Sequence, residues 1–162
     1  MVEFFPATKD DLAAIAEIYN HYILHSTATF HCKKMGPGDM SEVIYLSNPD
    51  YLSFVVKEKG GIIGYCFLAP YHRRQAYRRS VEASIYLRPE YTGKGIGCAA
   101  LDRLEAAAKK AGIRVVIGTL CSENSASIRL LEKAGYSKCA HLKNVGEKFG
   151  KVLDVVMYQK EI

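Results

Sequence analysis

The sequence predicts an α/β fold in which one mixed β-sheet carries helices on both faces, built as a single domain over residues 1–162. Three observations predict it. Segments with strand and helix patterns alternate along the chain without a linker or an internal repeat. Two early β-rich runs are joined by a pair of glycines, which is typical of an antiparallel hairpin. A strand, three alternating glycines, a helix and another strand then follow over residues 80–120, which is the order of a parallel crossover.

The first quarter of the chain predicts a short strand and two helices. An apolar run at residues 2–6 precedes Thr8, which is an N-cap residue with Asp11 three positions later. Apolar residues then recur at helical spacing and predict a long amphipathic helix up to residue 23. A second, weaker helix is expected over residues 37–46.

The next segments predict three strands. Residues 51–57 and 62–68 are β-rich and are joined at Gly60-Gly61, so they should pair as a hairpin. Residues 80–87 alternate between apolar and polar side chains, which indicates a strand with two different faces. Glu82 lies on the polar face of this strand.

The second half of the chain predicts two helices and three strands. The helix that begins at Gly95 has an apolar stripe and ends at Gly112. The strand after it should lie parallel to the strand before it, because a helical crossover separates them. The remaining elements are expected at residues 113–120 (strand), 125–133 (helix) and 136–158 (two strands around a loop at residues 146–150).

Composition and charge narrow the classes of protein. The net charge of +5 comes from dispersed basic residues, which suits small anionic ligands better than nucleic acid. The five cysteines show no metal-ligand spacing, so neither a metal site nor a disulfide framework is expected. Reduced thiols, an amino terminus without a signal pattern and the lack of a membrane-length apolar run indicate a cytoplasmic protein that does not bind membranes.

The glycine segment is the clearest functional motif. Gly93, Gly95 and Gly97 allow backbone N–H groups to approach an anion closely, and the helix that follows adds free donors and a positive dipole end. A nucleoside-triphosphate loop is disfavoured because Lys94 stands between two of the glycines and Ile96 follows them. The segment therefore predicts a phosphate site of another kind.

Three interpretations of this phosphate site stay open. Residues 95–100 satisfy the letters G-x-G-x-x-A of a dinucleotide fold, but no acidic residue follows about twenty positions on to bind a ribose. The second interpretation is coenzyme A, whose pyrophosphate could lie on the same glycines. The third is a tight turn between strand and helix without a ligand.

These motifs resemble the GCN5-related N-acetyltransferase (GNAT) family over nearly the whole chain. The resemblance implies a mixed, mostly antiparallel sheet of six to seven strands and acetyl-CoA as the co-substrate. Several short segments are similar more narrowly to the phosphinothricin, or methionine sulfoximine and sulfone, acetyltransferase branch. The resemblance to the family rests on the strand-glycine-helix core and on residues 124–136, and the resemblance to the branch rests on residues 18–23, 26–30, 76–78, 81–82 and 146–154.

The resemblance implies how acetyl-CoA would lie. Its pantetheine arm would pair with the backbone of one strand, its pyrophosphate would lie in the glycine segment, and Asn124 would contact it near the thioester. Thr92 stands where the family usually has arginine or glutamine, so that phosphate contact is missing or comes from Lys94. The residues expected to bind the cofactor are Ile85, Tyr86, Leu87, Gly93, Lys94, Gly95, Ile96, Gly97, Cys98 and Asn124.

Glu82 is the candidate catalytic residue. An ammonium cannot attack a thioester, so a base must remove a proton from the amine, and burial on a central strand would raise the pKa of this carboxyl toward a useful range. The alternative is a structural ion pair, for example with Arg78. No general acid is assigned, because Leu131 stands where the family usually has a proton donor; Tyr136 and His141 are the substitutes considered.

The resemblance also implies an acceptor site for a small-molecule amine. Arg74 and Tyr77 match positions that hold the acidic groups of the substrate, and a guanidinium suits a carboxylate or phosphinate. Lys148 and Phe149 lie in a loop that the family brings near the acceptor, often across a homodimer. The residues expected to bind the acceptor are Phe30, His72, Arg73, Arg74, Tyr77 and Glu82, although a solvated basic loop is an alternative for the cations.

The sequence thus predicts an N-acetyltransferase that moves an acetyl group to a small amino acid or an analogue by direct attack. Two other functions stay open at this stage. A dinucleotide-dependent oxidoreductase would use the same glycines. A catalytically silent module that binds acyl-CoA would explain the lack of a general acid.

Overall fold

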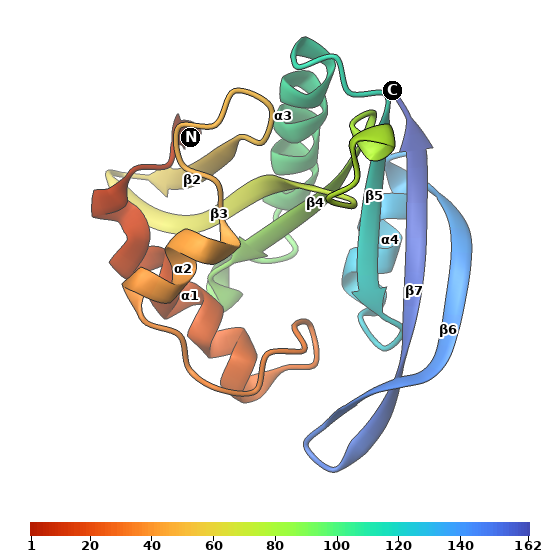
Figure 1. Ribbon diagram of the computed structural model, residues 1–162. Coiled ribbons are helices and arrows are strands. Elements are labelled where there is room, and N and C mark those ends of the chain that lie inside the picture. Colours follow the sequence, from red (N-terminus) through yellow and green to blue (C-terminus); the bar gives the residue numbers. More distant parts are fainter.

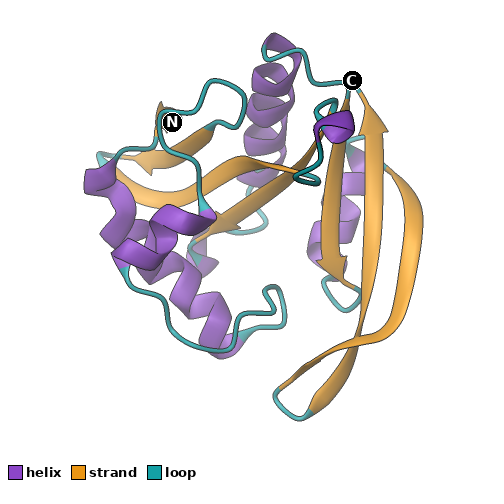
Figure 2. Ribbon diagram, viewed as in Figure 1, coloured by secondary structure: helices purple, strands orange, loops and turns teal.

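In the computed structural model, which describes residues 1–162, the chain forms one seven-stranded sheet with helices on both faces (Figure 1, Figure 2). The strand order is β1-β2-β3-β4-β5-β7-β6, and every neighbouring pair is antiparallel except β4 and β5. The predicted fold class is therefore confirmed. The strands are β1 Val2–Pro6, β2 Ser53–Glu58, β3 Gly61–Pro70, β4 Ser80–Leu87, β5 Val115–Cys121, β6 Ser137–Lys148 and β7 Lys151–Glu161, and the helices are α1 Leu12–His25, α2 Pro37–Val43, α3 Ile96–Lys110 and α4 Ser125–Lys133.

Each face of the sheet has its own apolar core. Helices α1 and α2 pack on the face that presents Tyr65 and Phe67 of β3. Helices α3 and α4 pack on the opposite face, which presents Cys66 and Leu68 of the same strand. Successive residues of a strand point to opposite faces, so this alternation fixes which side of the sheet each later side chain occupies.

Turn chemistry explains where the elements begin and end. The backbone N–H of Thr8 donates to Oδ2 of Asp11 at 2.9 Å, so the predicted capping pair does begin the first helical segment. The hairpin turn between β2 and β3 is formed by Lys59 and Gly60, both with positive φ, one position before the expected pair of glycines. Helix α2 stops at Val43, earlier than expected.

The last hairpin also differs from the expectation. Phe149 and Gly150 have positive φ and form a two-residue turn, so Gly146 and Lys148 belong to strand β6 and not to a loop. The hairpin of β6 and β7 consequently extends beyond the other strands (Figure 1). No helix is long and apolar enough to cross a membrane.

Strands β4 and β5 pair only at one end. Their parallel register covers Ser80 with Val115, Val81 with Val116 and Glu82 with Ile117, and stops there. Beyond this point β4 continues to pair with β3 on one side, and β5 continues to pair with β7 on the other. The two central strands therefore diverge after Glu82, which leaves a fork in the middle of the sheet.

Candidate active site

The edge of β4 that faces the fork carries unpaired backbone groups. The N–H of Arg88 donates to the carbonyl of Ile63 on β3, so the alternating ladder turns the backbone of Tyr86 toward β3 and that of Ile85 away from it. The carbonyl of Leu87 also faces away from β3 and accepts a hydrogen bond from the hydroxyl of Tyr22 on α1. An extended ligand in the fork could thus pair with β4 as an additional strand.

The glycine segment, called the cradle below, presents free backbone N–H groups at the far end of β4. The consecutive backbone N–H groups from Gly93 to Gly97 donate to no acceptor within the protein. Gly93 and Gly95 have φ of +72° and +81°, a conformation that favours glycine, and a Cβ on either would meet no atom within 4 Å. A Cβ on Gly97 would lie 3.2 Å from Cδ2 of Leu130, so this glycine is needed for packing of α3 on α4.

The residues around the cradle are placed as follows. Ile96 is buried as the first residue of α3, Cys98 is half-buried in its first turn, and Lys94 is exposed with its ammonium 5.3 Å from the ring centroid of Tyr91. Asn124 is the N-cap of α4, where its side-chain oxygen accepts from the N–H of Ser127 at 3.2 Å. Its side-chain NH₂ group makes no hydrogen bond within the protein and is free to donate.

Glu82 lies where the fork opens. It pairs in register with Ala69 of β3, which places its side chain on the α1 and α2 face of the sheet. Burial raises the pKa of this carboxyl, while a hydrogen bond from the hydroxyl of Thr119 on β5, at 3.2 Å, opposes the shift. None of the ion pairs in the structure involves Glu82, so the considered pairing with Arg78 is absent.

Neither substitute for the general acid lies beside Glu82. Tyr136 is buried on the α3 face and its hydroxyl donates to Oε1 of Glu105 at 3.0 Å. Nε2 of His141 lies 2.8 Å from Oδ2 of Asp154. The residue opposite His141 on β7 is Val156, which belongs to the core on the α3 and α4 face, so His141 lies on that face too. The two substitutes considered therefore lie across the sheet from Glu82, and each has a hydrogen-bond partner of its own.

Leu131 fills the position where a proton donor was expected. It is buried, and a Cβ added to Gly118 of β5 would lie 2.6 Å from its Cδ1. The leucine side chain therefore packs directly on the backbone of Gly118, where no larger residue would fit without a shift. The site has no titratable group at this position.

The expected acceptor residues lie in two groups. His72, Arg73, Arg74 and Tyr77 are exposed on the loop between β3 and β4, just before Glu82 in the chain, and the N–H of Arg74 donates to Nδ1 of His72 at 3.2 Å. Phe30 is distant from this loop in sequence. It follows α1, and its ring covers Gly146 of β6, where a Cβ would lie 2.4 Å from the ring.

Two contacts at the site were not predicted from the sequence. The hydroxyl of Thr119 donates to Glu82, which is 37 positions away in the chain. The hydroxyl of Tyr22 donates to the carbonyl of Leu87, which is 65 positions away. Strand register and the packing of α1 on the sheet create these contacts, and no local pattern predicts them. Strand alternation alone could have identified Thr119 as a polar residue on β5.

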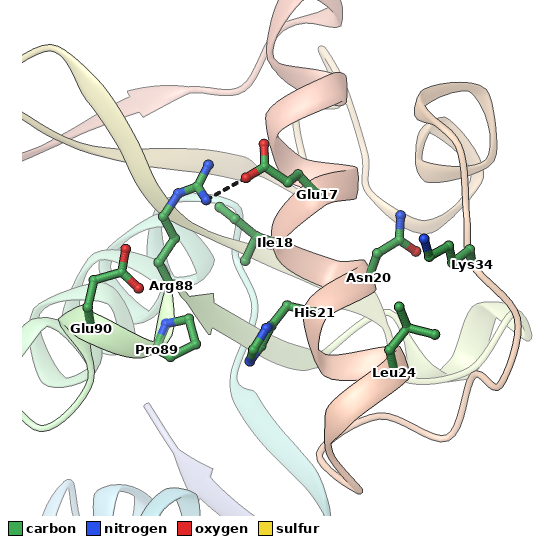
Figure 3. Close-up of a pocket in the computed structure, with 9 residues that line it drawn as sticks. All are labelled: Glu17, Ile18, Asn20, His21, Leu24, Lys34, Arg88, Pro89 and Glu90. Carbon is green, nitrogen blue, oxygen red and sulfur yellow. Dashed lines mark hydrogen bonds and ion pairs between the residues drawn. The ribbon is translucent and has the colours of Figure 1, made fainter.

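A surface cavity of about 520 Å³ lies between α1 and the turn that follows β4 (Figure 3). On its wall, Nη1 of Arg88 donates to Oε1 of Glu17 at 2.7 Å, and Nε of Arg88 donates to the carbonyl of Ile62 at 3.0 Å. This pairing ties α1 to the turn that leads into the glycine segment. None of the residues predicted to bind either substrate lines the cavity.

Comparison with known proteins identifies the family. The model of the acetyltransferase (GNAT) family matches residues 14–136. The chain belongs to this family. A GNAT acetyltransferase fold replaces the dinucleotide-dependent oxidoreductase considered above, in agreement with a sheet that has only one parallel pair of strands.

Relatives of known name cover almost the whole GNAT chain. It is 35% identical to an L-methionine sulfoximine/L-methionine sulfone acetyltransferase of Salmonella typhimurium, over 96% of this chain and 92% of the relative. It is 33% identical to the L-amino acid N-acyltransferase MnaT of Escherichia coli, over 96% and 91% of the two chains. The structure of a phosphinothricin acetyltransferase from Sinorhizobium meliloti in complex with acetyl-CoA matches with a TM-score of 0.94 and 32% identity, over 99% of this chain and 88% of that one.

Proposed function

We propose that this acetyltransferase moves the acetyl group of acetyl-CoA to the α-amine of a small amino acid or a close analogue, with residues 1–162 acting as one domain. The observation that carries the proposal is the fork between β4 and β5. It opens at a half-buried carboxyl, Glu82, and leads along an unpaired strand edge to the free N–H groups of Gly93 to Gly97. Substrate specificity is inferred from relatives that are named as amino-acid acetyltransferases.

We expect acetyl-CoA to lie along the fork in one orientation. The pyrophosphate would bind the cradle at the start of α3, where free donors and the helix dipole stabilise negative charge. The pantetheine arm would follow the edge of β4 past Ile85, and the thioester would then lie near Glu82 and the free amide of Asn124. The Sinorhizobium meliloti structure in complex with acetyl-CoA supports this cofactor.

The chemical step is a direct attack. Glu82 accepts a proton from the acceptor ammonium, and the nitrogen lone pair then forms a bond to the thioester carbonyl carbon to give a tetrahedral intermediate. The carbon–sulfur bond breaks to release the thiolate of coenzyme A, and the new amide nitrogen loses its second proton to this thiolate or to solvent. The raised pKa of Glu82 suits this role, because a base works best when its pKa lies near the working pH. A covalent route through the buried Cys66 of β3 is disfavoured, because burial raises the pKa of this thiol to about 12 and little of the reactive thiolate forms.

The leaving group departs without a protein acid in this scheme. Leu131 cannot donate a proton, and Tyr136 and His141 lie on the other face of the sheet. A thiolate is a fair leaving group because thiols are much stronger acids than alcohols; the pKa of a free cysteine, for example, is about 8.5. The catalytic contribution of the protein then rests on positioning the two substrates and on deprotonating the amine.

The acceptor would be held at both ends. Arg74, with Arg73, His72 and Tyr77 beside it, would bind the carboxylate or another acidic group, since a guanidinium donates two parallel hydrogen bonds. Glu82 would face the amine, and Phe30 would pack on the acceptor side chain. The names of the Salmonella typhimurium and Escherichia coli relatives support an amino acid in this place.

We further propose that the enzyme is a cytoplasmic homodimer. The β6–β7 hairpin exposes several large apolar side chains, which is typical of a protein interface. The cysteines are all free, as in a reducing compartment. The exposed apolar residues of the hairpin are Leu142, Val145, Phe149 and Val152.

The deciding experiment measures release of free thiol from acetyl-CoA. The acceptor panel should include L-amino acids, methionine sulfone, methionine sulfoximine, phosphinothricin, a polyamine and a short peptide. We expect thiol to be released faster with amino acids than with the polyamine or the peptide. Binding of acetyl-CoA, seen as a rise in melting temperature, without thiol release from any amine would instead support the catalytically silent module.

A further inference from the structure

Lys148 is a buried lysine that bonds only to backbone carbonyls. Only 3% of its surface is exposed. Its ammonium donates to the carbonyl oxygens of Ser26 at 2.6 Å, Thr29 at 2.7 Å and Tyr22 at 3.4 Å. No carboxylate forms an ion pair with it. The three donors of the charged form thus meet three acceptors, which is the full capacity of the group.

These carbonyls belong to the end of α1 and to the segment that follows it. The carbonyl of Tyr22 lies in the last turn of the helix, where the helix dipole favours a cation. Ser26 to Phe30 have no regular structure of their own and depend on such contacts for their position. Burial lowers the pKa of the Lys148 amine, so the position carries an energetic cost that the surrounding structure offsets.

The same segment contacts the hairpin at a second point. Gly146 leaves room for the ring of Phe30, which a Cβ at that position would contact at 2.4 Å. Phe30 as a whole is 39% exposed, so one part of the residue covers the hairpin and another part stays open. Thr29 is held in addition by a 2.6 Å hydrogen bond between its hydroxyl and that of Tyr19.

We propose that Lys148 is a positioning residue for the acceptor: it fastens the tip of the β6–β7 hairpin to residues 26–30 and thereby holds the ring of Phe30 in a fixed orientation. The open part of this ring then forms a rigid apolar wall for the acceptor side chain. The inference deepens the proposed function and rests on it for the identity of the acceptor. It makes Lys148 a determinant of acceptor selectivity that touches neither substrate.

The test is Lys148→Met, which keeps the aliphatic stem and removes the three hydrogen bonds. The KM for methionine sulfone should rise about tenfold, and the preference for methionine sulfone over alanine in kcat/KM should fall by a similar factor. The dissociation constant of acetyl-CoA should change by less than about twofold, because the cradle lies elsewhere. Lys143→Met, at an exposed lysine of the same hairpin, is the matched control and should leave all three quantities unchanged.

Gly146→Ala is a second variant that leaves every hydrogen bond of Lys148 in place and displaces only the ring of Phe30. It should reproduce the loss of selectivity, and it keeps the inference testable if Lys148→Met does not fold. Wild-type selectivity in either folded variant would overturn the inference.

Hydrogen exchange separates this inference from the proposed function. Amides of residues 26–30 should exchange about tenfold faster in Lys148→Met than in the wild type. If the wild type acetylates no amino acid, the proposed acceptor class is wrong. The hydrogen-exchange rates of residues 26–30 then test by themselves whether Lys148 holds this segment. Equal exchange in the two proteins would then overturn its role in holding this segment.

Discussion

The hydroxyl of Thr119 on β5 donates to Oε1 of Glu82 on β4 at 3.2 Å, across the point where the two strands diverge. This contact joins both sides of the fork at its origin. It also opposes the rise in the pKa of Glu82 that burial causes. The hydroxyl therefore keeps a larger fraction of the carboxyl ionised and able to accept a proton.

Thr119→Val should move the acidic limb of the activity profile. Removing the donor raises the pKa of Glu82, so the decline of kcat on acidification should begin at a higher pH than in the wild type. A pH series of thiol release under saturating substrates measures this shift. Thr119→Ser keeps the hydroxyl and is the control. An acidic limb at the wild-type pH in Thr119→Val would show that the contact does not tune the base.

Glu82→Gln should lower kcat by a factor on the order of a hundred or more, the usual contribution of a general base. Glutamine has nearly the same size and can still accept the hydrogen bond of Thr119, so the fold should persist. Acetyl-CoA affinity, measured by calorimetry, should stay near the wild-type value. Turnover and a pH profile that match the wild type would remove Glu82 from the mechanism.

The sequence predicts the placement of Glu82 on its strand and of the glycines before α3 well, because these signals are local. Period-two alternation places Glu82 on the polar face of β4, and the glycine spacing marks the cradle and the start of α3. Both depend on residues that are neighbours in the chain. The pairing of β4 with β5 in parallel follows from the helical crossover between them.

The rest of the site depends on contacts between distant segments. The end of the pairing at Glu82 is a property of register, which no pattern within one strand specifies. The glycines that flank Lys148 predict a loop, yet this lysine is buried against carbonyls more than a hundred positions away. The placement of Tyr136 and His141 on the other face from Glu82 likewise depends on strand register and on core packing, which no local pattern specifies.

Gly95→Val should weaken acetyl-CoA binding at least tenfold, because a side chain there points into open space that the phosphate must enter. Positive φ adds backbone strain of about 1–2 kcal/mol, which lowers stability independently of the ligand. Gly112→Val separates the two effects. Gly112 also has positive φ, and a Cβ there would meet no atom within 4 Å, but it lies at the other end of α3.

Calorimetric titration with acetyl-CoA distinguishes these glycine variants. The melting temperatures of both variants should fall by a similar amount, while only Gly95→Val should bind acetyl-CoA more weakly. Equal affinity for acetyl-CoA in the two variants would mean that the cradle does not hold the pyrophosphate.

Arg74→Lys should raise the KM for an acidic acceptor while leaving acetyl-CoA affinity unchanged. Lysine keeps the charge but loses the planar fork that donates two parallel hydrogen bonds to a carboxylate. An increase of about tenfold is expected, and Arg78→Lys in the same exposed loop serves as the control. Unaltered amino-acid kinetics in Arg74→Ala would assign the carboxylate to another cation, while the acetyltransferase activity itself would be unaffected.

The lack of a proton donor at Leu131 predicts the alkaline side of the pH profile. If the thiolate leaves unassisted, kcat should rise as Glu82 ionises and then stay level up to about pH 10, since no group must remain protonated for turnover. A general acid would instead cause a decline at high pH. Tyr22 is the first residue to examine in that event, because it donates to the Leu87 carbonyl at the fork and its pKa is raised by burial. A descending limb that disappears in Tyr22→Phe would identify an acid and contradict the unassisted departure of coenzyme A.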